Sequence, residues 1–504
     1  MSLVPRGAQR ASVQGNRSVG LPFALAVALI VGAALLAGSG VAGTTTQSVA
    51  SRTIAKATSA PATKRPLAKS PVGATSNGTT RPAANPPAGS FVATSGNDAN
   101  PGTFGQPWRT VQHAAKVANG IVWLRAGTYS GGVTVTRSGI TFEAYPGQLA
   151  IVNGGPFGFR FYKVSSGAVR FLTIQNANSS GGAGVIVDSS SNVTVASSVI
   201  HNNKNYGVRT LHATNTVVRD SQIYKNQEGI RISYASAGTQ ILNNSIYSQD
   251  TMFANESSGG VGITFFKTTG SVLASGNRLW LNRAKSHRYG YDGGAFEIFG
   301  ASDVTITGNI AWNNKDVMET GTNGPACNNL TFTRNIGFAA STVKGYARGL
   351  IIACGSNSLV ANNTLDGFDI SDISVVNKPH YRFEGSIAGL KVENNILRSG
   401  SKGVFYFDHL PSNVTIDYNL VWNSSGGSLV YVAGKGSTSS FATLRSWIGG
   451  RMAHGIQADP RFYNGSTHDY RLAPSSAAID HGVNLGAITP NTTTGPDIGR
   501  FEMR

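Results

Sequence analysis

Four acidic residues, Asp292, Glu297, Asp316 and Glu319, lie in one short stretch of this 504-residue chain and are its best candidates for chemistry. Glu297 and Glu319 are 22 residues apart, in the similar contexts GGAFEIF and KDVMETG. If 22 residues make one turn of a coiled chain, the two acids become neighbours about 5 Å apart. Carboxyl groups about 5–5.5 Å apart are typical of retaining glycosidases, and such closeness raises one pKa, as a general acid requires.

The same acids have a simpler interpretation as solvated strand residues, paired with Arg209 or Arg231 on earlier turns. In YGVRT and EGIRI, Arg follows Gly by two residues. That phase, copied onto GGAFEIF, would turn Glu297 towards the core, where an unpaired carboxylate is costly. We expect instead that Ala295 and Glu297 face outward while Phe296 faces the core. A catalytic pair and a binding or plain surface role both remain open from the sequence.

Several further side chains could contact a substrate. They belong to a loop inserted before Asp292 and to two earlier turns: His287, Arg288, Tyr289, Tyr291, Arg231 and Lys267. Aromatic rings stack on sugar rings, and Arg and Lys bind carboxylates and hydroxyls. Ordinary loop packing is the alternative. If the site uses a cation, Asp292 and Asp316 are its candidate ligands and calcium is the candidate ion; no other cofactor is expected.

A repeat along the chain indicates which elements position these residues. Asn or a small polar residue recurs every 23 to 33 residues: Ser198, Ser221, Asn244, Asn277, Asn309, Asn335, Asn363, Asn395 and Asn419. Short Val/Ile runs and Gly/Asn turns lie between these positions. This pattern predicts a parallel β-helix with three strands per turn, in which the Asn side chains hydrogen-bond along the stack. The leucine framework of leucine-rich repeats is absent, and the period is too short for a propeller blade.

The two ends of this region resemble a known superfamily. FVATSGNDANPGTFGQPWRTVQ, which begins at residue 91, resembles the start of secreted right-handed β-helix proteins of the pectate-lyase-like superfamily, and residues 458–502 resemble their closing segment. The resemblance implies an all-β fold over residues 91–504, a right-handed parallel β-helix. Trp108–Ala118 is amphipathic at helical spacing, and we expect it to cap the open end of the coil. Such scaffolds host many reactions.

Part of the acidic stretch also resembles pectate lyases of polysaccharide lyase family nine. DGGAFE (292–297) matches the segment that carries their catalytic lysine, and NNKDVMET (313–320) matches a segment on the next turn. Glu297 occupies the lysine position, and Arg278 stands where an aspartate would help to hold calcium. These departures argue against a lysine-base, calcium-assisted lyase here. The remaining candidate bases are Glu297, Lys267, Lys285 and His287.

The charge and the cysteines narrow the function classes. Lys plus Arg exceed Asp plus Glu by 42 − 24 = 18, but residues 1–90 hold nine basic residues and no acid. Net charge is therefore weak evidence for nucleic-acid binding, and we expect no nucleic-acid partner. Cys327 and Cys354 are 27 residues apart, about one turn. They predict either a disulfide between adjacent turns or two buried thiols, and no zinc site.

The N-terminal region predicts export. Residues 1–20 are a basic tail, and residues 21–43 are apolar and long enough to cross a membrane. This segment is either a membrane anchor or a cleaved signal peptide, and both interpretations put the rest of the chain outside the membrane. Residues 44–90, rich in Thr, Ser, Ala and Pro, predict a disordered linker. We expect a monomer that is extracellular or held in the cell envelope.

Together these features predict an exported, carbohydrate-active β-helix protein that cleaves a polysaccharide by hydrolysis or elimination. The folded part carries a net charge of 33 − 24 = +9, which suits an anionic glycan. The alternative is a non-catalytic glycan-binding or surface-adhesion solenoid. The expected partners are a polysaccharide and, if residues 21–42 stay uncleaved, the membrane.

Overall fold

The computed structural model describes residues 86–256, 258–288, 290–339, 347–376, 383–399, 403–489 and 494–502. The predicted basic tail, the apolar segment 21–43 and the linker up to residue 85 lie outside the described residues, as does Tyr289. Among the described residues, no helix combines the length and the hydropathy needed to cross a membrane.

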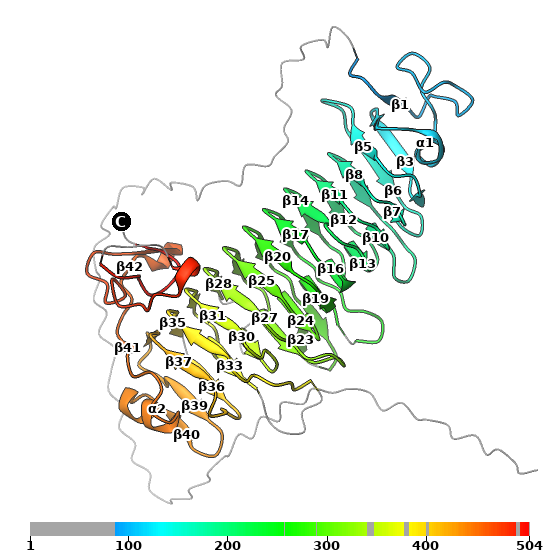
Figure 1. The fold of residues 1–504 in the computed structure, drawn as a ribbon. Helices are drawn as coiled ribbons and strands as arrows, with labels where there is room; N and C mark the ends of the chain where they lie inside the picture. Colours follow the sequence, from blue (N-terminus) through cyan, green and yellow to red (C-terminus); the bar gives the residue numbers. More distant parts are fainter. Residues whose placement is uncertain are drawn as a thin grey trace, which may run out of the picture. The chain divides into compact units, whose positions relative to one another are not determined.

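The chain winds into a coil in which each turn contributes one strand to each of three sheets (Figure 1). We call them sheets A, B and C, in the order in which the chain visits them. Each sheet has 13 strands, and strands from successive turns pair in parallel, apart from an antiparallel pair that ends sheet C. The predicted parallel β-helix with three strands per turn is therefore confirmed.

The strands are short, as expected for Val- and Ile-rich runs between Gly and Asn bends. Sheet A consists of β1 (Ser90–Val92), β2 (Ile121–Leu124), β5 (Ile140–Ala144), β8 (Gly167–Arg170), β11 (Val193–Ala196), β14 (Val217–Arg219), β17 (Thr239–Leu242), β20 (Val272–Ser275), β25 (Val304–Thr307), β28 (Thr331–Thr333), β31 (Leu359–Ala361), β34 (Lys391–Glu393) and β37 (Thr415–Asp417).

Sheets B and C complete each turn. Sheet B consists of β3 (Gly127–Ser130), β6 (Ala150–Asn153), β9 (Thr173–Gln175), β12 (Val199–His201), β15 (Gln222–Tyr224), β18 (Ser245–Tyr247), β21 (Arg278–Trp280), β26 (Ile310–Trp312), β29 (Ile336–Phe338), β32 (Thr364–Asp366), β35 (Ile396–Ser399), β38 (Leu420–Asn423) and β41 (Ile456–Gln457). Sheet C consists of β4 (Val133–Val135), β7 (Phe159–Tyr162), β10 (Ala183–Asp188), β13 (Tyr206–Leu211), β16 (Glu228–Ala235), β19 (Val261–Thr269), β24 (Gly294–Phe299), β27 (Asp316–Gly321), β30 (Arg348–Ile352), β33 (Ile373–Val375), β36 (Phe405–Phe407), β39 (Val430–Val432) and β40 (Gly436–Thr438).

The remaining elements lie outside the three sheets. They are α1 (Val111–Val117), the hairpin of β22 (Ala284–Ser286) and β23 (Gly290–Asp292), α2 (Phe441–Trp447), the hairpin of β42 (Phe462–Asn464) and β43 (Asp469–Leu472), and two 3₁₀ turns, Gly465–Thr467 and Gly486–Ile488.

The core fills the inside of the coil with apolar side chains in register. In sheet C one such row runs through Val208, Ile230, Ile263, Phe296, Met318 and Leu350, all at most 3% exposed. Burying a side chain of this size contributes about 1.5–3 kcal/mol. Because successive residues of a strand point to opposite sides, the residue that follows each of these positions along its strand faces outward.

The predicted asparagine ladder is confirmed at the bend between sheets A and B. From β8 to β37 this bend has two residues on every turn, and from β11 onward the second one is the ladder residue. The side-chain oxygen of Asn277 accepts hydrogen bonds from the backbone and side-chain N–H groups of Asn244, at 2.9 and 3.0 Å, and the next turns repeat this pattern. The buried amides thus have their partners. A second ladder, which the sequence analysis missed, lies at the bend between sheets B and C: Asn203, Asn226, Gln249, Asn282 and Asn314.

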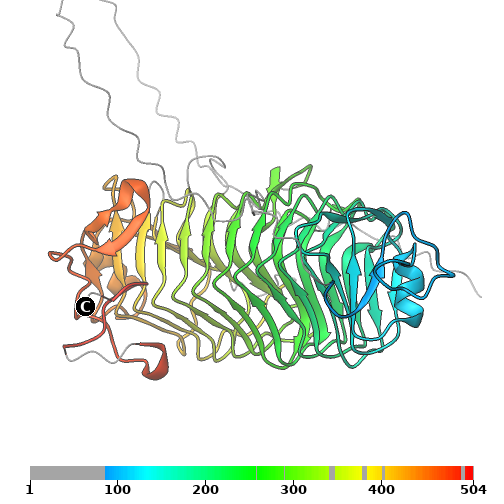
Figure 2. The same cartoon turned by 90° about the horizontal axis from the view of Figure 1, so that it is seen from above.

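The coil is covered at its N-terminal end by α1, as predicted (Figure 2). The helix begins three residues later than the amphipathic stretch, because Trp108 bridges to Val92 and the Thr110 hydroxyl caps the helix. At the other end, residues 458–489 and 494–502 fold back over sheet B, where Leu472 and Ile498 pack in one apolar cluster.

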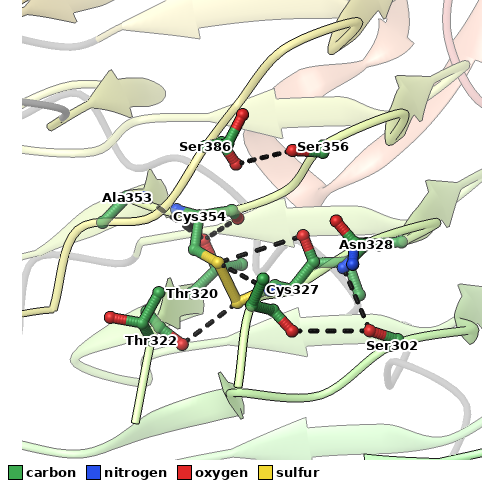
Figure 3. Close-up of a disulfide and its surroundings, with 12 residues drawn as sticks. Ser302, Thr320, Thr322, Cys327, Asn328, Ala353, Cys354, Ser356 and Ser386 are labelled. Carbon is green, nitrogen blue, oxygen red and sulfur yellow. Dashed lines mark hydrogen bonds between the residues drawn. A yellow bond between two sulfur atoms is a disulfide. The ribbon is translucent and has the colours of Figure 1, made fainter. Parts of the chain in front are cut away.

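Cys327 and Cys354 form a disulfide, so the first of the two alternatives is correct (Figure 3). It joins the bends that follow β27 and β30, with 5.5 Å between the Cα atoms. Both cysteines are fully buried. The cross-link therefore ties together two turns next to the candidate acids.

Candidate functional site

Glu297 and Glu319 are direct neighbours on the outer face of sheet C. Their Cα atoms are partners in the pairing of β24 with β27, while the flanking residues Phe296 and Met318 point into the core. Paired parallel strands lie about 4.8 Å apart, so the two carboxyl groups share one site. Glu297 is only 6% exposed and Glu319 is half-buried. The juxtaposition predicted from the 22-residue spacing is confirmed.

The expected outward position of Ala295 is wrong, because this side chain belongs to the core. Gly294 is the partner of Val261, so Ala295 occupies the position that glycines hold on three earlier turns: Gly207, Gly229 and Gly262. Glu297 then follows Ala295 by two residues, as Arg231 follows its glycine. The error came from aligning Gly294, instead of Ala295, with those glycines.

All four predicted acids gather at this point. Asp292 ends the hairpin strand β23, and Asp316 begins β27, two residues before the core residue Met318. Asp316 is only 1% exposed. Negative charge on Asp292 raises the pKa of both Glu297 and Glu319, so these carboxyl groups lie within electrostatic reach of one another.

Two cations in this cluster were missed by the sequence analysis. The ammonium group of Lys315 donates a hydrogen bond to Oδ2 of Asp316. Arg348 is the Cα partner of Asp316 on the next turn. Both lower the pKa of Glu319. Lys315 adjoins a candidate acid and Arg348 follows Asp316 by one long turn, so the register could have identified both.

Burial raises the pKa of each acid in this site. Burial, followed by the charges of Asp292 and Glu319, raises the pKa of Glu297 well above its ordinary value. Burial also raises the pKa of Glu319 to about 7, against the effect of Lys315, and that of Asp292 to about 6. Burial lowers the pKa of Lys315, but Asp316 and Glu319 outweigh it and hold that pKa above the ordinary value. With a pKa of about 7, Glu319 is partly ionised at neutral pH, and the pKa of Glu297 is shifted in the same direction.

Arg231 is not the partner of these glutamates that the simpler interpretation required. Its guanidinium donates to both carboxylate oxygens of the fully buried Glu228, at 2.9 and 3.1 Å. Thr264 lies between Arg231 and Glu297 in the outer row. Arg231 still lowers the pKa of Glu297, which places it at the margin of the site.

The predicted loop residues lie beside Asp292. Glu256, in the segment between β18 and β19, accepts hydrogen bonds from the His287 backbone N–H and the Ser286 hydroxyl, at 2.8 and 3.0 Å. It also contacts Nδ1 of His287 at 2.8 Å, although the His287 side chain is 98% exposed. Arg288 donates its backbone N–H to the Ser286 hydroxyl. Tyr291 belongs to β23, where it pairs with Lys285.

Lys267 does not join the site. It lies in an irregular part of β19, with a φ of 52°, and its ammonium group lies 5.3 Å from the ring centroid of Phe266. A side chain at Gly324, in the bend after β27, would meet it. In the part of the chain that the structure describes, Lys267 forms no ion pair with the four acids.

The acids do not fit a calcium site. Calcium takes six to eight oxygen ligands, whereas Oδ2 of Asp316 already binds the Lys315 ammonium. No cluster of three or more His, Cys, Asp or Glu among the described residues has the arrangement of a metal site. The expected role of Asp292 and Asp316 as calcium ligands is therefore not supported.

Comparison with known proteins identifies the family to which the β-helix belongs. The family model "Right handed beta helix region" matches residues 126–279, 183–342 and 292–443, which together make up more than half of the chain. The chain belongs to this family of right-handed β-helices. A relative, the "Uncharacterized protein YwoF" of Bacillus subtilis (strain 168), is 22% identical over 439 residues, which cover 77% of this chain and 91% of the relative.

Solved structures share the right-handed β-helix at low sequence identity. XylC in complex with xylose is 12% identical, with a TM-score of 0.53 over 82% of this chain and 98% of XylC. The catalytic unit of a thermostable GH87 α-1,3-glucanase from Streptomyces thermodiastaticus strain HF3-3 is 14% identical, with a TM-score of 0.51 over 70% and 68% of the two chains. Pectate lyase Pel9A is 16% identical, with a TM-score of 0.44 over 83% and 97%. The two structures with TM-scores above 0.5, the xylose-bound XylC and the α-1,3-glucanase, therefore share their fold with this chain.

Proposed function

We propose that this protein hydrolyses a polysaccharide at the carboxyl pair Glu297–Glu319. The observation that carries the proposal is the register that makes these two residues neighbours on an outer strand face while burial raises the pKa of each. Glycoside hydrolysis needs this combination of one protonated and one ionised carboxyl group, set close together.

The two glutamates take different roles because their surroundings differ. Glu297 keeps its proton and donates it to the glycosidic oxygen, while the Glu319 carboxylate, stabilised by Lys315 and Arg348, attacks the anomeric carbon. The glycosidic bond breaks and a glycosyl ester forms on Glu319. The ionised Glu297 then takes a proton from water, whose oxygen attacks the anomeric carbon and frees Glu319. The spacing of one strand supports retention of configuration.

Lys315 favours hydrolysis over elimination. An elimination base must lose its proton before it can act, but Asp316 and Glu319 hold the pKa of Lys315 above its ordinary value. Lys315 therefore remains a cation that stabilises the Glu319 carboxylate. Asp316 positions that ammonium group through their hydrogen bond, and Asp292 adds the negative charge that keeps Glu297 protonated.

We also propose that the protein acts outside the cytoplasmic membrane. The apolar segment 21–43 supports export by either of its two interpretations. The buried Cys327–Cys354 disulfide supports it as well, because structural disulfides are typical of oxidising compartments.

The test is product analysis with the full chain on a panel of polysaccharides. We expect new reducing ends without unsaturated products, and a loss of about 10³-fold or more in Glu297→Gln. Glu143→Gln is the matched control, since Glu143 lies in β5 on the outer face of sheet A. Unsaturated products would contradict hydrolysis and indicate elimination. Binding without any product would favour the non-catalytic solenoid.

A further inference from the structure

We infer that sheet C also carries a subsite for an acidic sugar, three turns before the carboxyl pair, with Arg209 as its charged group. This inference rests on the proposed function, because it assigns a substrate class to the same glycan. The carboxyl pair determines which bond breaks, and the subsite determines which polymer binds.

The register sets the distance between the two places. Arg209, Arg231, Thr264 and Glu297 occupy the same outward row on β13, β16, β19 and β24. Three steps of about 4.8 Å put Arg209 about 14 Å along the coil from Glu297. A pyranose unit of an extended glycan advances by a similar step. A chain laid along this row therefore has its anionic group about three sugar units from the cleaved bond.

Arg209 is the arginine of this row that lacks an acidic partner among the described residues. Arg160 binds Asp188 and Arg231 binds Glu228. Arg209, in contrast, donates from one terminal nitrogen to the carbonyl oxygen of Gly181 at 3.4 Å, and its buried Nε has no acceptor. A half-buried guanidinium with unused donors is suited to a carboxylate or a sulfate, which accepts from two nitrogens at once.

An apolar cluster beside Arg209 favours a sugar over a simple anion. Ala183, Ile186 and Tyr206 form a cluster outside the core, against which Phe157 and Phe253 pack. The rings of Tyr206 and Phe253 are 5.7 Å apart, and the Arg209 guanidinium lies 5.0 Å from the Tyr206 ring. Phe157 and Phe253 are half-exposed. Rings next to a guanidinium match the two sides of an acidic sugar, its C–H face and its anionic group.

One segment links the subsite to the acids. Phe253 and Glu256 belong to the same connection between β18 and β19. Phe253 packs on Tyr206 at the subsite, while Glu256 binds His287 beside Asp292. A glycan that extends over both places therefore meets two parts of the same connection.

The test measures binding without cleavage, in the full chain carrying Glu297→Gln. The probes are polygalacturonate for carboxylates, dextran sulfate for sulfates and dextran as the neutral polymer. We expect Arg209→Gln to weaken the affinity for one polyanion by about tenfold or more, with dextran unaffected. Arg209→Lys keeps the charge but loses the planar fork, so its affinity should fall in between. The polymer that responds identifies the anionic group.

Arg219→Gln is the matched control, because Arg219 lies in β14 of sheet A and loses the same charge. It should change the affinity by less than about twofold, as an exposed rim charge does. Equal losses in Arg209→Gln and Arg219→Gln, no loss in Arg209→Gln, or no binding of either polyanion by the parent would each overturn the subsite.

The outcomes separate the two proposals. If the wild-type chain yields no product but Arg209→Gln still loses affinity for a polyanion, hydrolysis is wrong and the subsite stands. If the wild-type chain cleaves a polyanion and Arg209→Gln leaves its KM unchanged, the subsite is wrong and hydrolysis stands.

Discussion

On the outer faces of sheets B and C, the residues of successive turns are aligned in the same way, but the two faces carry different kinds of side chains. On sheet B aromatic rings of several kinds form a continuous stack: His201, Tyr224, Tyr247, Trp280, Trp312 and Phe338, followed by His468 from the C-terminal segment. On sheet C the equivalent row changes from arginine to threonine to glutamate within a few turns.

The difference separates stabilisation from function. Stacked rings contribute about 0.5–1.5 kcal/mol per pair beyond their burial, so a repeated ring stabilises its neighbours. Neighbouring carboxyl groups such as Glu297 and Glu319 destabilise one another instead. A row of residues that retains such a destabilising interaction is a better candidate for chemistry than a row whose contacts stabilise the fold.

The largest expected effect is on catalysis at sheet C. Glu319→Gln should lower kcat by about 10³-fold or more, since the amide cannot form the glycosyl ester. Steady-state kinetics on the polymer that the wild-type chain cleaves provide the measurement. Glu393→Gln, on the outer face of sheet A, is the control and should retain its activity. A Glu319→Gln variant within tenfold of the wild-type kcat would remove the nucleophile from the mechanism.

A change in the stack of sheet B should have the opposite profile. Trp312→Ala removes the ring contacts to Trp280 and Phe338, with centroids 4.8 and 6.0 Å away, and should lower the free energy of unfolding by about 2 kcal/mol. Its kcat should stay within twofold. Denaturant unfolding and kinetics check both, with Ser245→Ala on the same face as the control. A large loss of kcat would mean that the stack takes part in catalysis.

The smallest expected effect is on the pH dependence of stability, which tests whether the ionised Glu319 carboxylate destabilises the fold. The folded state holds the Glu319 proton up to a pKa of about 7, above the ordinary 4.5, so it binds that proton more tightly than the unfolded chain does. Wild-type stability should therefore fall as pH rises from about 4.5 to 7, and Glu319→Gln should escape this loss. The variant should be more stable by on the order of 1–2 kcal/mol at pH 8 and equal to wild type at pH 4. Thermal unfolding at both values tests this; a gain confined to pH 4 would contradict it.

The sequence predicted the fold and the central pair for the same reason. Asn277 and its equivalents mark one fixed bend, and a fixed bend converts the spacing of Glu297 and Glu319 into adjacency. Where the chain departs from that regularity, the predictions were wrong or incomplete. Ala295 replaces the expected glycine and shifted the assumed phase. Lys267 sits at an extra residue of β19 opposite β16, which turns it away from the acids.

Other parts of the site were missed because the spacing of the acids alone does not point to them. Lys315 adjoins Asp316 and Arg348 is the Cα partner of Asp316 on the next turn, so both are identified only once the register is known. The partner of Arg231 was missed for a different reason. Glu228 lies three residues earlier on the same strand, and regular alternation would place the two side chains on opposite faces. The choice between disulfide and thiols for Cys327 likewise required knowing that two bends meet.

The two-residue bend between sheets A and B has a consequence for how this protein can change. From β8 to β37 it admits no extra residue, whereas the connections at both edges of sheet C range from a few residues to more than ten. Variation in loop length is thus concentrated at the two edges of sheet C. Recognition loops can be gained, lengthened or shortened there, while the constant bend between sheets A and B keeps successive turns aligned.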